Sequence, residues 1–172
     1  MRYMISEYCN IAWNDIYFEH GAYGKPYISN IDNFHFSLSN SADLIVFVHD
    51  INEIGIDAEK ITVHDIEVAK NFFTKEEYEY ILSSPQENNA FYEVWTKKEA
   101  YLKMLGIGLS KPLNSFSVFS NEISKMFLTV EFYNYCISVC CHSANISSLL
   151  PIEITFEDIQ KKFIPDHKLC IT

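Results

Sequence analysis

Carboxylates and lysines in two short segments are spaced so that they could assemble one polar site. Glu99 and Lys103 are four residues apart and would share one face of a helix. Asp57 and Glu59, in the apolar run IGIDAE, would project from the same side of a strand. A few carboxylates together with lysines suit Mg²⁺ and the phosphate oxygens of a substrate. These residues therefore indicate a site that binds or transfers a phosphate group.

Each of these motifs also has an ordinary structural interpretation. A glutamate followed four residues later by a lysine is usually a solvent-exposed helix pair, worth about 0.2–0.5 kcal/mol. An Asp-x-Glu pair at the end of a strand is common at a surface edge or turn. The motifs gain weight together, because GKPY at residues 24–27 and FSLSNS at residues 36–41 precede them in the chain.

In the order and spacing of its motifs the chain resembles the 4′-phosphopantetheinyl transferases of the larger, two-lobed Sfp type, which activate carrier proteins of peptide and polyketide synthases. The resemblance runs through GKPYISNIDNFHFSLSNS, GIDAEK, VAKNFFTKEEY and WTKKEAYLKMLGIGLSKPLNSFSV. It extends from about residue 15 to about residue 118. No single tetrapeptide is specific to the family, but the ordered set of motifs is.

The resemblance implies a role for each residue that matches a family motif. Asp57, Glu59 and Glu99 match the carboxylates that bind Mg²⁺, and Glu99 also matches the candidate general base. Lys25 and Pro26 match residues that contact the adenine end of coenzyme A, and Ser39 and Asn40 match residues that contact its 3′-phosphate. Lys98 and Lys103 match the two lysines of the KEAxxK helix, and the second of these contacts the diphosphate. Asn40 replaces the family's histidine, so a potentially cationic phosphate contact becomes a neutral amide.

The function implied by the resemblance is that of an enzyme, a 4′-phosphopantetheinyl transferase of the holo-[acyl-carrier-protein] synthase type. Such an enzyme transfers 4′-phosphopantetheine from coenzyme A to a serine of an acyl or peptidyl carrier protein and expels 3′,5′-adenosine bisphosphate. Mg²⁺ and Lys103 would neutralise the diphosphate, and Glu99 would accept the serine proton. The alternative is a non-catalytic, truncated relative that binds a carrier protein or coenzyme A, and the Asn40 replacement favours it.

The resemblance begins late in the family pattern, because only 23 residues precede Gly24. We therefore expect residues 1–50 to form a partial N-terminal lobe and residues 51–172 a C-terminal lobe with the metal site, in one compact unit. A shortened first lobe would leave apolar side chains uncovered, and a homo-oligomer or a complementing chain would then cover them. The side chains expected in this surface are Ile5, Tyr8, Val46 or Phe47.

The composition narrows the class of protein. With 172 residues and 48% hydrophobic residues the chain can bury a core, and its net charge of −10 argues against nucleic acid as a partner. No apolar run has the roughly 18 residues of a membrane helix, and the N-terminus lacks a signal pattern, so we expect a cytoplasmic protein. The five cysteines lack CxxC spacing and indicate buried free thiols.

The hydrophobic periodicity predicts an α+β fold in which antiparallel sheets pack on a long helix. Helices are expected at about residues 1–8, 63–73, 74–83 and 87–105. Strands are expected at about residues 35–39, 43–49, 54–59, 115–119, 126–132, 136–142 and 152–156. Thr74 followed by Glu77 predicts a capping box at the start of one helix.

Overall fold

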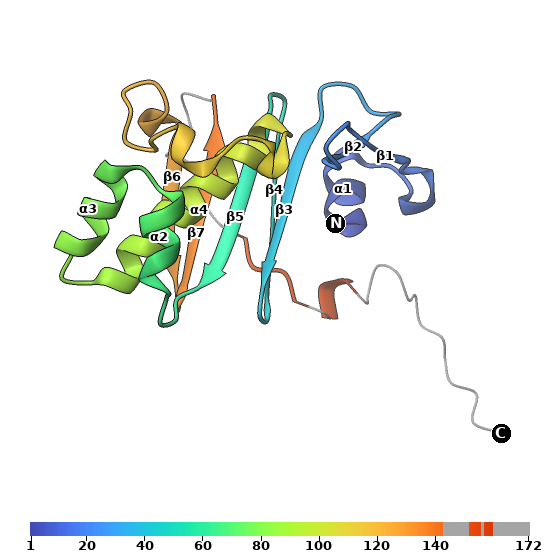
Figure 1. Cartoon of the computed structure of the whole chain (residues 1–172). Coiled ribbons are helices and arrows are strands. Elements are labelled where there is room, and N and C mark those ends of the chain that lie inside the picture. The colour runs from blue at the N-terminus through green and yellow to red at the C-terminus, as the bar shows by residue number, and fades with distance from the viewer. Residues whose placement is uncertain (143–151, 156, 160–172) are drawn as a thin grey trace. The chain divides into compact units, whose positions relative to one another are not determined.

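The computed structural model describes residues 1–142, 152–155 and 157–159 of the chain (Figure 1). Backbone contacts divide the described residues into two units, one within Met1–Ile16 and Ser148–Thr172 and the other within Tyr17–Ser147. The predicted division into residues 1–50 and 51–172 is a different one and stays a prediction. None of the described helices is long and apolar enough to cross a membrane.

The smaller unit contains the predicted N-terminal helix, α1 (Arg2–Cys9), which ends at Asn10 in a left-handed conformation with φ 52°. A single 3-10 turn, η1 (Trp13–Asp15), follows. The guanidinium of Arg2 donates to the carbonyls of Trp13 and Ile16, at 2.6 and 2.9 Å. These bonds fasten the segment after the helix to the first turn of α1.

The larger unit is built on a three-stranded antiparallel sheet in the order β5-β7-β6, formed by β5 (Ile54–Lys60), β6 (Phe127–Phe132) and β7 (Tyr135–Cys141). The strand β5 is predominantly buried, and Asp57 on it lies opposite Ser138 on β7. The predicted strands at 54–59, 126–132 and 136–142 are confirmed with bounds shifted by one residue at most.

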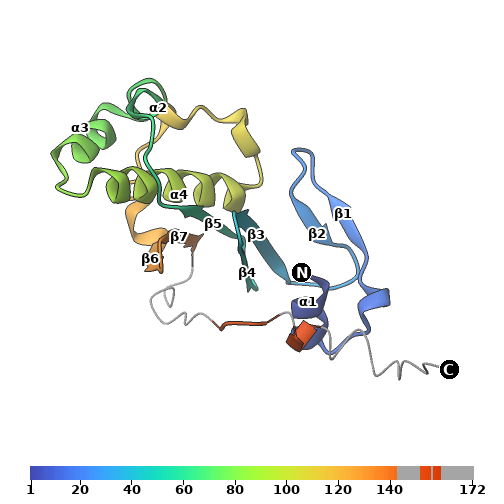
Figure 2. The ribbon, with the colours of Figure 1, turned by 90° about the horizontal axis from the view of Figure 1, so that it is seen from below.

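The long helix α4 (Glu87–Leu105) lies along one face of this sheet, as Figure 2 shows. Gly55 on β5 makes this close approach possible, because a Cβ at Gly55 would lie only 2.0 Å from the carbonyl oxygen of Ala100. The helix ends at Gly106, whose left-handed φ of 67° lets its N–H bond back to the last turn. The α+β class with antiparallel sheets packed on a long helix is confirmed.

The helices α2 (Ile66–Phe72) and α3 (Lys75–Ser83) lie on the side of α4 away from the sheet (Figure 2). The helix predicted from residue 63 begins later, because the Asp65 side chain caps it by accepting from the N–H of Glu67. The capping box of Thr74 and Glu77 is confirmed. A core of buried apolar side chains joins these helices to α4: Ala69, Phe73, Ile81, Ala90, Phe91, Val94, Leu102, Phe116 and Val118.

A two-stranded antiparallel hairpin, β3 (His35–Ser41) and β4 (Leu44–Asp50), packs beside β5. Ser41 pairs with Leu44, so the turn consists of two residues, and Ala42 takes a positive φ of 50° there. Both strands were predicted and are confirmed. Val46 and Val48 of β4 pack against the apolar cluster of Ile54 and Ile56.

The periodicity does not predict a second hairpin, β1 (Phe18–His20) and β2 (Pro26–Ile28). Each strand has three residues, which is too short for an alternating pattern to be visible. The GKP motif forms the turn that leads into β2. Gly24 has φ 86° there and donates its N–H to the carbonyl of Gly21, at 2.9 Å.

Two predicted strands are wrong. Residue 115 ends the 3-10 turn η3 (Leu113–Ser115), and a bend and a further turn follow, in which two N–H groups bond to side chains instead of a neighbouring strand. Val118 donates to the Glu77 carboxylate at 2.8 Å, and Phe119 donates to the Ser117 hydroxyl at 3.2 Å. Residues 152–155 have no regular structure, and residue 156 of that prediction lies outside the described residues.

The cysteines within the described residues are free thiols, and Cys136, Cys140 and Cys141 are buried as predicted. Burial raises the pKa of the Cys136 thiol to about 11, so it carries no negative charge at neutral pH. Cys170 lies outside the described residues. The three buried thiols therefore belong to the core, whereas Cys9 is only half-buried, in contrast to the prediction.

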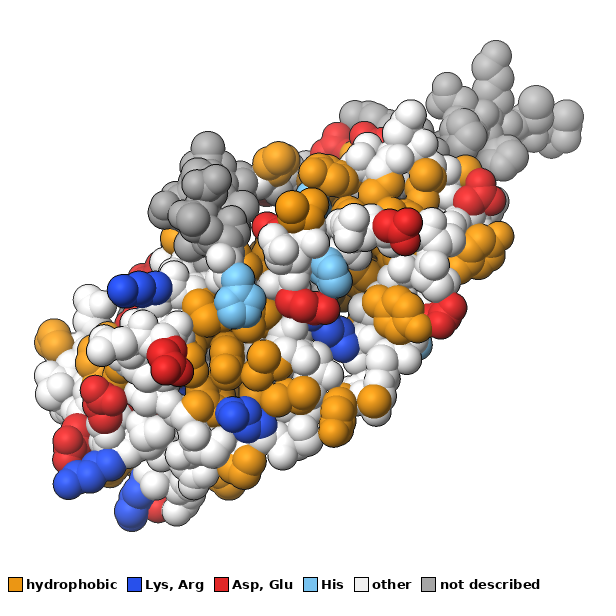
Figure 3. Space-filling view, turned by 90° about the horizontal axis from the view of Figure 1, so that it is seen from above, with side chains coloured by type: hydrophobic (Ala, Val, Ile, Leu, Met, Phe, Trp, Pro, Cys, Tyr) orange, Lys and Arg blue, Asp and Glu red, His pale blue; other side chains and the backbone are white. Residues whose placement is uncertain are grey.

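The four apolar side chains that were expected to form an uncovered surface differ in their exposure. Tyr8 is exposed, Val46 and Phe47 are half-buried, and Ile5 is fully buried. On the face drawn in Figure 3, hydrophobic side chains reach the surface between acidic, basic and histidine side chains. The prediction of an oligomer or a complementing chain stays a prediction, and the expected exposure of Ile5 is wrong.

Candidate functional site

The strand β5 and the helix α4 bring acidic and basic side chains together where Gly55 lets them approach. Asp57 and Glu59 project from one side of β5, and Asp57 is buried whereas Glu59 is half-buried. Glu99 and Lys103 lie one turn apart on α4, which packs directly on β5. The sequence motifs thus predicted two elements that do meet.

Asp57, Lys103 and Ser39 form a closed triangle of hydrogen bonds. Lys103 Nζ donates to Asp57 Oδ1 at 2.7 Å and to Ser39 Oγ at 2.8 Å. Ser39 Oγ in turn donates to Asp57 Oδ1 at 2.8 Å. The buried carboxylate is therefore neutralised by one ammonium and held in place by one hydroxyl.

Alternate serines of β3 connect this strand to β5, which it does not join by ladder hydrogen bonds. Ser37 Oγ accepts from the N–H of Ile56 at 3.1 Å. Ser41 Oγ donates to Glu59 Oε2 at 2.8 Å and accepts from the N–H of Lys60 at 3.1 Å. Sequence reasoning missed Ser37 and Ser41, although the spacing of two in FSLSNS places all three serines on one face of a strand.

The three carboxylates influence one another electrostatically. Burial raises the pKa of Asp57, and the Lys103 ammonium and the Ser39 hydroxyl oppose that rise. Burial also raises the pKa of Glu99, and the nearby charge of Asp57 raises it further. The pKa of Glu59 is raised by burial above all, with a smaller contribution from Asp57. Three partly desolvated acids that repel one another favour the binding of a cation.

The residues fit Mg²⁺, the ion that the family resemblance implies. Asp57 Oδ2 is buried and has no hydrogen-bond partner among the described residues, and Glu59 and Glu99 offer further carboxylate oxygens, the ligands that Mg²⁺ prefers. Within the residues that the structure describes, no three or more His, Cys, Asp or Glu side chains are already arranged to hold a metal ion. The chemistry of the donor set suits the ion, but the set is not preassembled.

Lys25 and Pro26, from the GKP motif, lie close to the C-terminal end of α4. Lys25 Nζ bonds to Glu53 Oε2 at 2.6 Å and to the carbonyl of Met104 at 3.0 Å. Pro26 is the first residue of β2 and is half-buried. Lys25 therefore contacts the residue next to Lys103, as expected for neighbours in one binding site. The Lys25 ammonium is at the same time paired with Glu53.

Ser39 and Asn40 do not face the same way. Ser39 points to Asp57, whereas Asn40, the next residue of β3, is exposed, because successive side chains of a strand alternate between its faces. The resemblance implies that both side chains contact one phosphate, but side chains on opposite faces of the strand cannot do so. Only Asn40 is open to a ligand from solvent.

Lys98 does not belong to the site, in contrast to the prediction. Its ammonium is fully buried, pairs with Glu77 Oε2 at 2.8 Å and donates to the carbonyls of Leu113 and Phe116 at 2.7 and 2.8 Å. It also lies 4.3 Å from the centroid of the Phe116 ring. Burial lowers the pKa of Lys98, and the Glu77 carboxylate opposes this. Lys98 is thus a structural residue that fastens the loop after α4.

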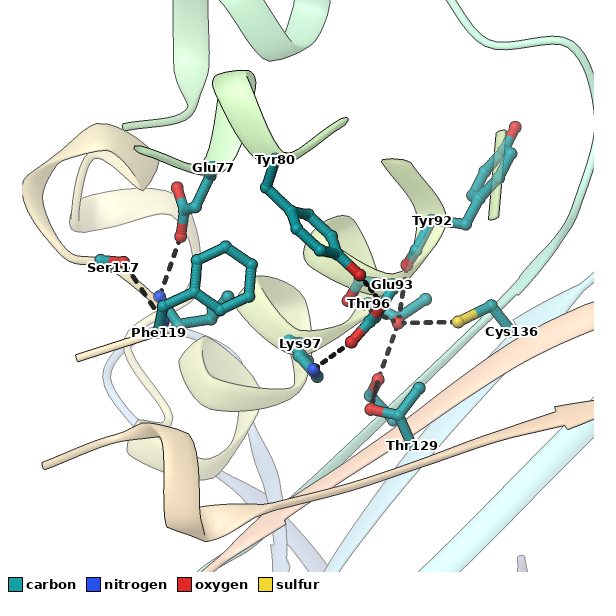
Figure 4. Close-up of polar contacts among 12 residues, drawn as sticks. Glu77, Tyr80, Tyr92, Glu93, Thr96, Lys97, Ser117, Phe119, Thr129 and Cys136 are labelled. Carbon is teal, nitrogen blue, oxygen red and sulfur yellow. Dashed lines mark hydrogen bonds and ion pairs between the residues drawn. The ribbon is translucent and has the colours of Figure 1, made fainter. Parts of the chain in front are cut away.

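Another group of polar contacts joins α4 to the sheet and to α3 (Figure 4). Thr96 Oγ1 lies 2.8 Å from Ser138 Oγ on β7, which lies 2.9 Å from Thr129 Oγ1 on β6. Glu93 on α4 accepts from the Tyr80 hydroxyl at 2.7 Å and forms an ion pair with Lys97. These contacts orient the helix and hence the direction in which Glu99 and Lys103 point.

A surface pocket of about 640 Å³ opens at the other end of α4 and contains none of these site residues. Its lining consists of Val63, His64, Pro85, Gln86, Glu87, Asn88, Asn89 and Glu131. The polar site on β5 is therefore identified by its chemistry and not by the size of a cavity.

Comparison with known proteins gives one family. The model of the "4'-phosphopantetheinyl transferase superfamily" matches residues 53–159. The 4′-phosphopantetheinyl transferase ffp of Bacillus subtilis is 40% identical over 124 residues, which cover 71% of this chain and 55% of ffp. The 4′-phosphopantetheinyl transferase Sfp of Bacillus subtilis strain 168 is 39% identical over 120 residues, 69% of this chain and 54% of Sfp. The chain thus spans about half the length of the curated relatives it matches.

Among solved structures, the holo-[acyl-carrier-protein] synthase of Thermotoga maritima covers 51% of this chain and 60% of its own, at 13% identity and a TM-score of 0.37. The sequence relatives are of the Sfp kind, and the finer prediction of a holo-[acyl-carrier-protein] synthase type is not specifically supported by them.

Proposed function

This chain belongs to the 4′-phosphopantetheinyl transferase superfamily, and on that premise we propose that it transfers 4′-phosphopantetheine from coenzyme A to a serine of an acyl or peptidyl carrier protein, with Mg²⁺ as the metal. We further propose that it acts in the cytoplasm, as a homo-oligomer or with a complementing chain. The observation that carries the proposal is the buried Asp57 carboxylate next to the Lys103 ammonium, with an Oδ2 that no other residue in the described part of the chain hydrogen-bonds.

The proposed reaction needs charge neutralisation and a base more than covalent catalysis. When bound by Asp57, Glu59 and Glu99, Mg²⁺ would neutralise the diphosphate of coenzyme A. Lys103 is 31% exposed, so its ammonium can reach a phosphate from its place on α4. The raised pKa of Glu99 makes it a better proton acceptor for the serine hydroxyl than an exposed glutamate.

Coenzyme A would lie along the β3 and β2 side of this centre. We propose Lys103 as its diphosphate contact, Lys25 and Pro26 as contacts at the adenine end, and Asn40 as a contact to the 3′-phosphate. Ser39 supports Lys103 by accepting its hydrogen bond. Lys98 is not proposed as a ligand, because its ammonium is fully buried against Glu77.

Intact-protein mass spectrometry tests the proposal. The purified chain is incubated with coenzyme A, Mg²⁺ and each of several acyl and peptidyl carrier proteins, and the expected result is the added mass of one phosphopantetheine on at least one of them. The variant Glu99→Gln keeps the shape of the side chain but removes its charge and basicity, so it should lose at least about a hundredfold in transfer rate.

The matched control is Lys70→Met, an exposed residue of α2 paired with Glu67. It should transfer at the unmodified rate. Absence of added mass on every carrier protein would contradict the proposed activity, and binding of coenzyme A or a carrier protein without transfer would favour the non-catalytic alternative.

A further inference from the structure

The Lys103 ammonium compensates the charge of Asp57, the carboxylate that a metal ion would also bind. It lies 2.7 Å from Oδ1 and is locked there by its second bond to Ser39 Oγ. The Asp57 side chain is 5% exposed, so very little water remains to share its charge. In the protein without a metal, Lys103 is thus the nearest compensating charge for this carboxylate.

A divalent cation and the ammonium repel each other strongly at such short range in a partly buried site. Oδ2 is buried and lacks a partner within residues 1–142, 152–155 and 157–159, so an ion that binds it approaches a carboxylate whose other oxygen already contacts a cation. Contact of both charges with Asp57 therefore carries an electrostatic cost, which falls when one of them moves away.

The side chain that can move is that of Lys103. It is attached to the last turn of α4 by a flexible four-carbon stem and is 31% exposed, so the ammonium can swing toward solvent without a shift of the helix. Asp57 has no such freedom, because it lies on a buried strand paired with β7.

We propose that Lys103 is an internal substitute cation, which neutralises Asp57 in the metal-free protein and is displaced when a divalent cation binds. The inference rests on the proposed function, since the displaced ammonium becomes available for the diphosphate of coenzyme A. Binding of the metal and of the diphosphate is then coupled, because each favours the position of Lys103 that the other requires.

Calorimetric titration with Mg²⁺ in the absence of coenzyme A tests this at pH 8.5. Lys103→Met removes the competing charge and should bind Mg²⁺ about tenfold or more tightly than the unmodified protein. Lys70→Met changes the net charge equally but lies on α2 and pairs with Glu67, so its Mg²⁺ affinity should be unchanged. Circular dichroism establishes that both variants are folded.

A second readout follows the Lys103 ammonium in the unmodified protein, and Lys103→Met serves only to assign its signal. In protein with ¹⁵N-labelled lysine side chains, the Lys103 ammonium should give a protected ¹H–¹⁵N signal, identified by its loss in Lys103→Met. Mg²⁺ should remove or shift that signal, and K⁺ at the same ionic strength should not.

Mg²⁺ binding that leaves the Lys103 signal unchanged would overturn the inference, and so would Mg²⁺ affinity that is equal or weaker in folded Lys103→Met. Absence of Mg²⁺ binding in both proteins would overturn it as well. The carrier-protein mass assay separates the two proposals, because transfer without displacement refutes only the role of Lys103, and displacement without transfer refutes only the enzymatic activity.

Discussion

Two lysines of α4, Lys98 and Lys103, each pair with a carboxylate, but the two pairs differ in how far their polar atoms are satisfied. Lys98 and Glu77 are both fully buried, and Glu77 also accepts from the N–H groups of Thr74 and Val118. Lys103 is partly exposed, and one oxygen of its partner Asp57 has no hydrogen-bond partner in the part of the chain that the structure describes.

This difference in hydrogen bonding indicates that the two lysine–carboxylate pairs of α4 have different roles. A buried pair with every atom engaged has nothing left for a ligand, and it fixes the loop that follows α4. A pair at the edge of solvent with an unused, buried acceptor can exchange its partner. The comparison therefore assigns the closed pair of Lys98 and Glu77 to stability and the open pair of Lys103 and Asp57 to binding.

The largest expected effect is on the closed pair. Lys98→Met leaves the Glu77 carboxylate buried without its cation and removes two bonds to loop carbonyls, so it should lower the free energy of unfolding by about 3–5 kcal/mol. Urea denaturation followed by circular dichroism measures this. A loss below about 1 kcal/mol would show that the pair is not a structural centre.

Gly55→Ala tests the close contact of β5 and α4, which brings Asp57 and Lys103 of the open pair together. The new Cβ would lie 2.0 Å from the Ala100 carbonyl oxygen and 2.4 Å from the Met104 nitrogen, and these backbone atoms cannot yield without moving the helix. We expect a loss of about 1–3 kcal/mol in the free energy of unfolding. An unchanged thermal midpoint would contradict the close contact of α4 and β5.

Asn40→His tests whether the open side of β3 meets the 3′-phosphate. A histidine restores the family's residue at an exposed position, and a charge-assisted contact there should tighten coenzyme A by about tenfold at pH 6. Calorimetry with 3′-dephospho-coenzyme A is the control, and equal changes for the two ligands would place the phosphate elsewhere.

The smallest expected effect is a pH dependence of stability. The pKa of Glu99 is raised on folding, so its protonated form stabilises the protein fully below the usual 4.5, and this contribution is lost as the pH rises through the folded pKa. Glu99→Gln cannot titrate, so it removes this pH-dependent contribution to the free energy of unfolding. The variant should therefore gain stability relative to the unmodified protein as the pH increases from 4.5, and urea titrations at several pH values without metal would reveal it. A difference that is constant with pH would contradict the burial of Glu99.

Sequence motifs could predict which residues form the centre of the site, but not which of the two lysines on α4 belongs to it and which stabilises the fold. Asp57 stands in a short apolar run and Glu99 in a clear helical pattern, so a strand and a helix could be predicted there, and the order of the family motifs indicated that the two meet. Lys98 stands beside Glu99 in the same motif, and only the packing of α3 and the loop after α4 shows that it is buried. No local pattern encodes that contact.

The fold shows the same limit. Long elements such as α4 and β5 have enough residues for a periodic pattern, whereas the three-residue strands β1 and β2 do not. Residues 115–119 alternate as a strand would, yet their N–H groups bond to Glu77 and Ser117. Tertiary hydrogen bonds override the local preference there.

The most direct test of the central claim compares the two lysines in one assay. Single-turnover transfer to a carrier protein, expressed per folded molecule, is measured for Lys98→Met and Lys103→Met at saturating Mg²⁺. We expect Lys103→Met to lose at least about tenfold in rate while it stays folded, and Lys98→Met to lose stability but keep its rate per folded molecule. The opposite pattern, with Lys103→Met fully active and Lys98→Met folded but inactive, would contradict the assignment of the open pair as the reactive centre.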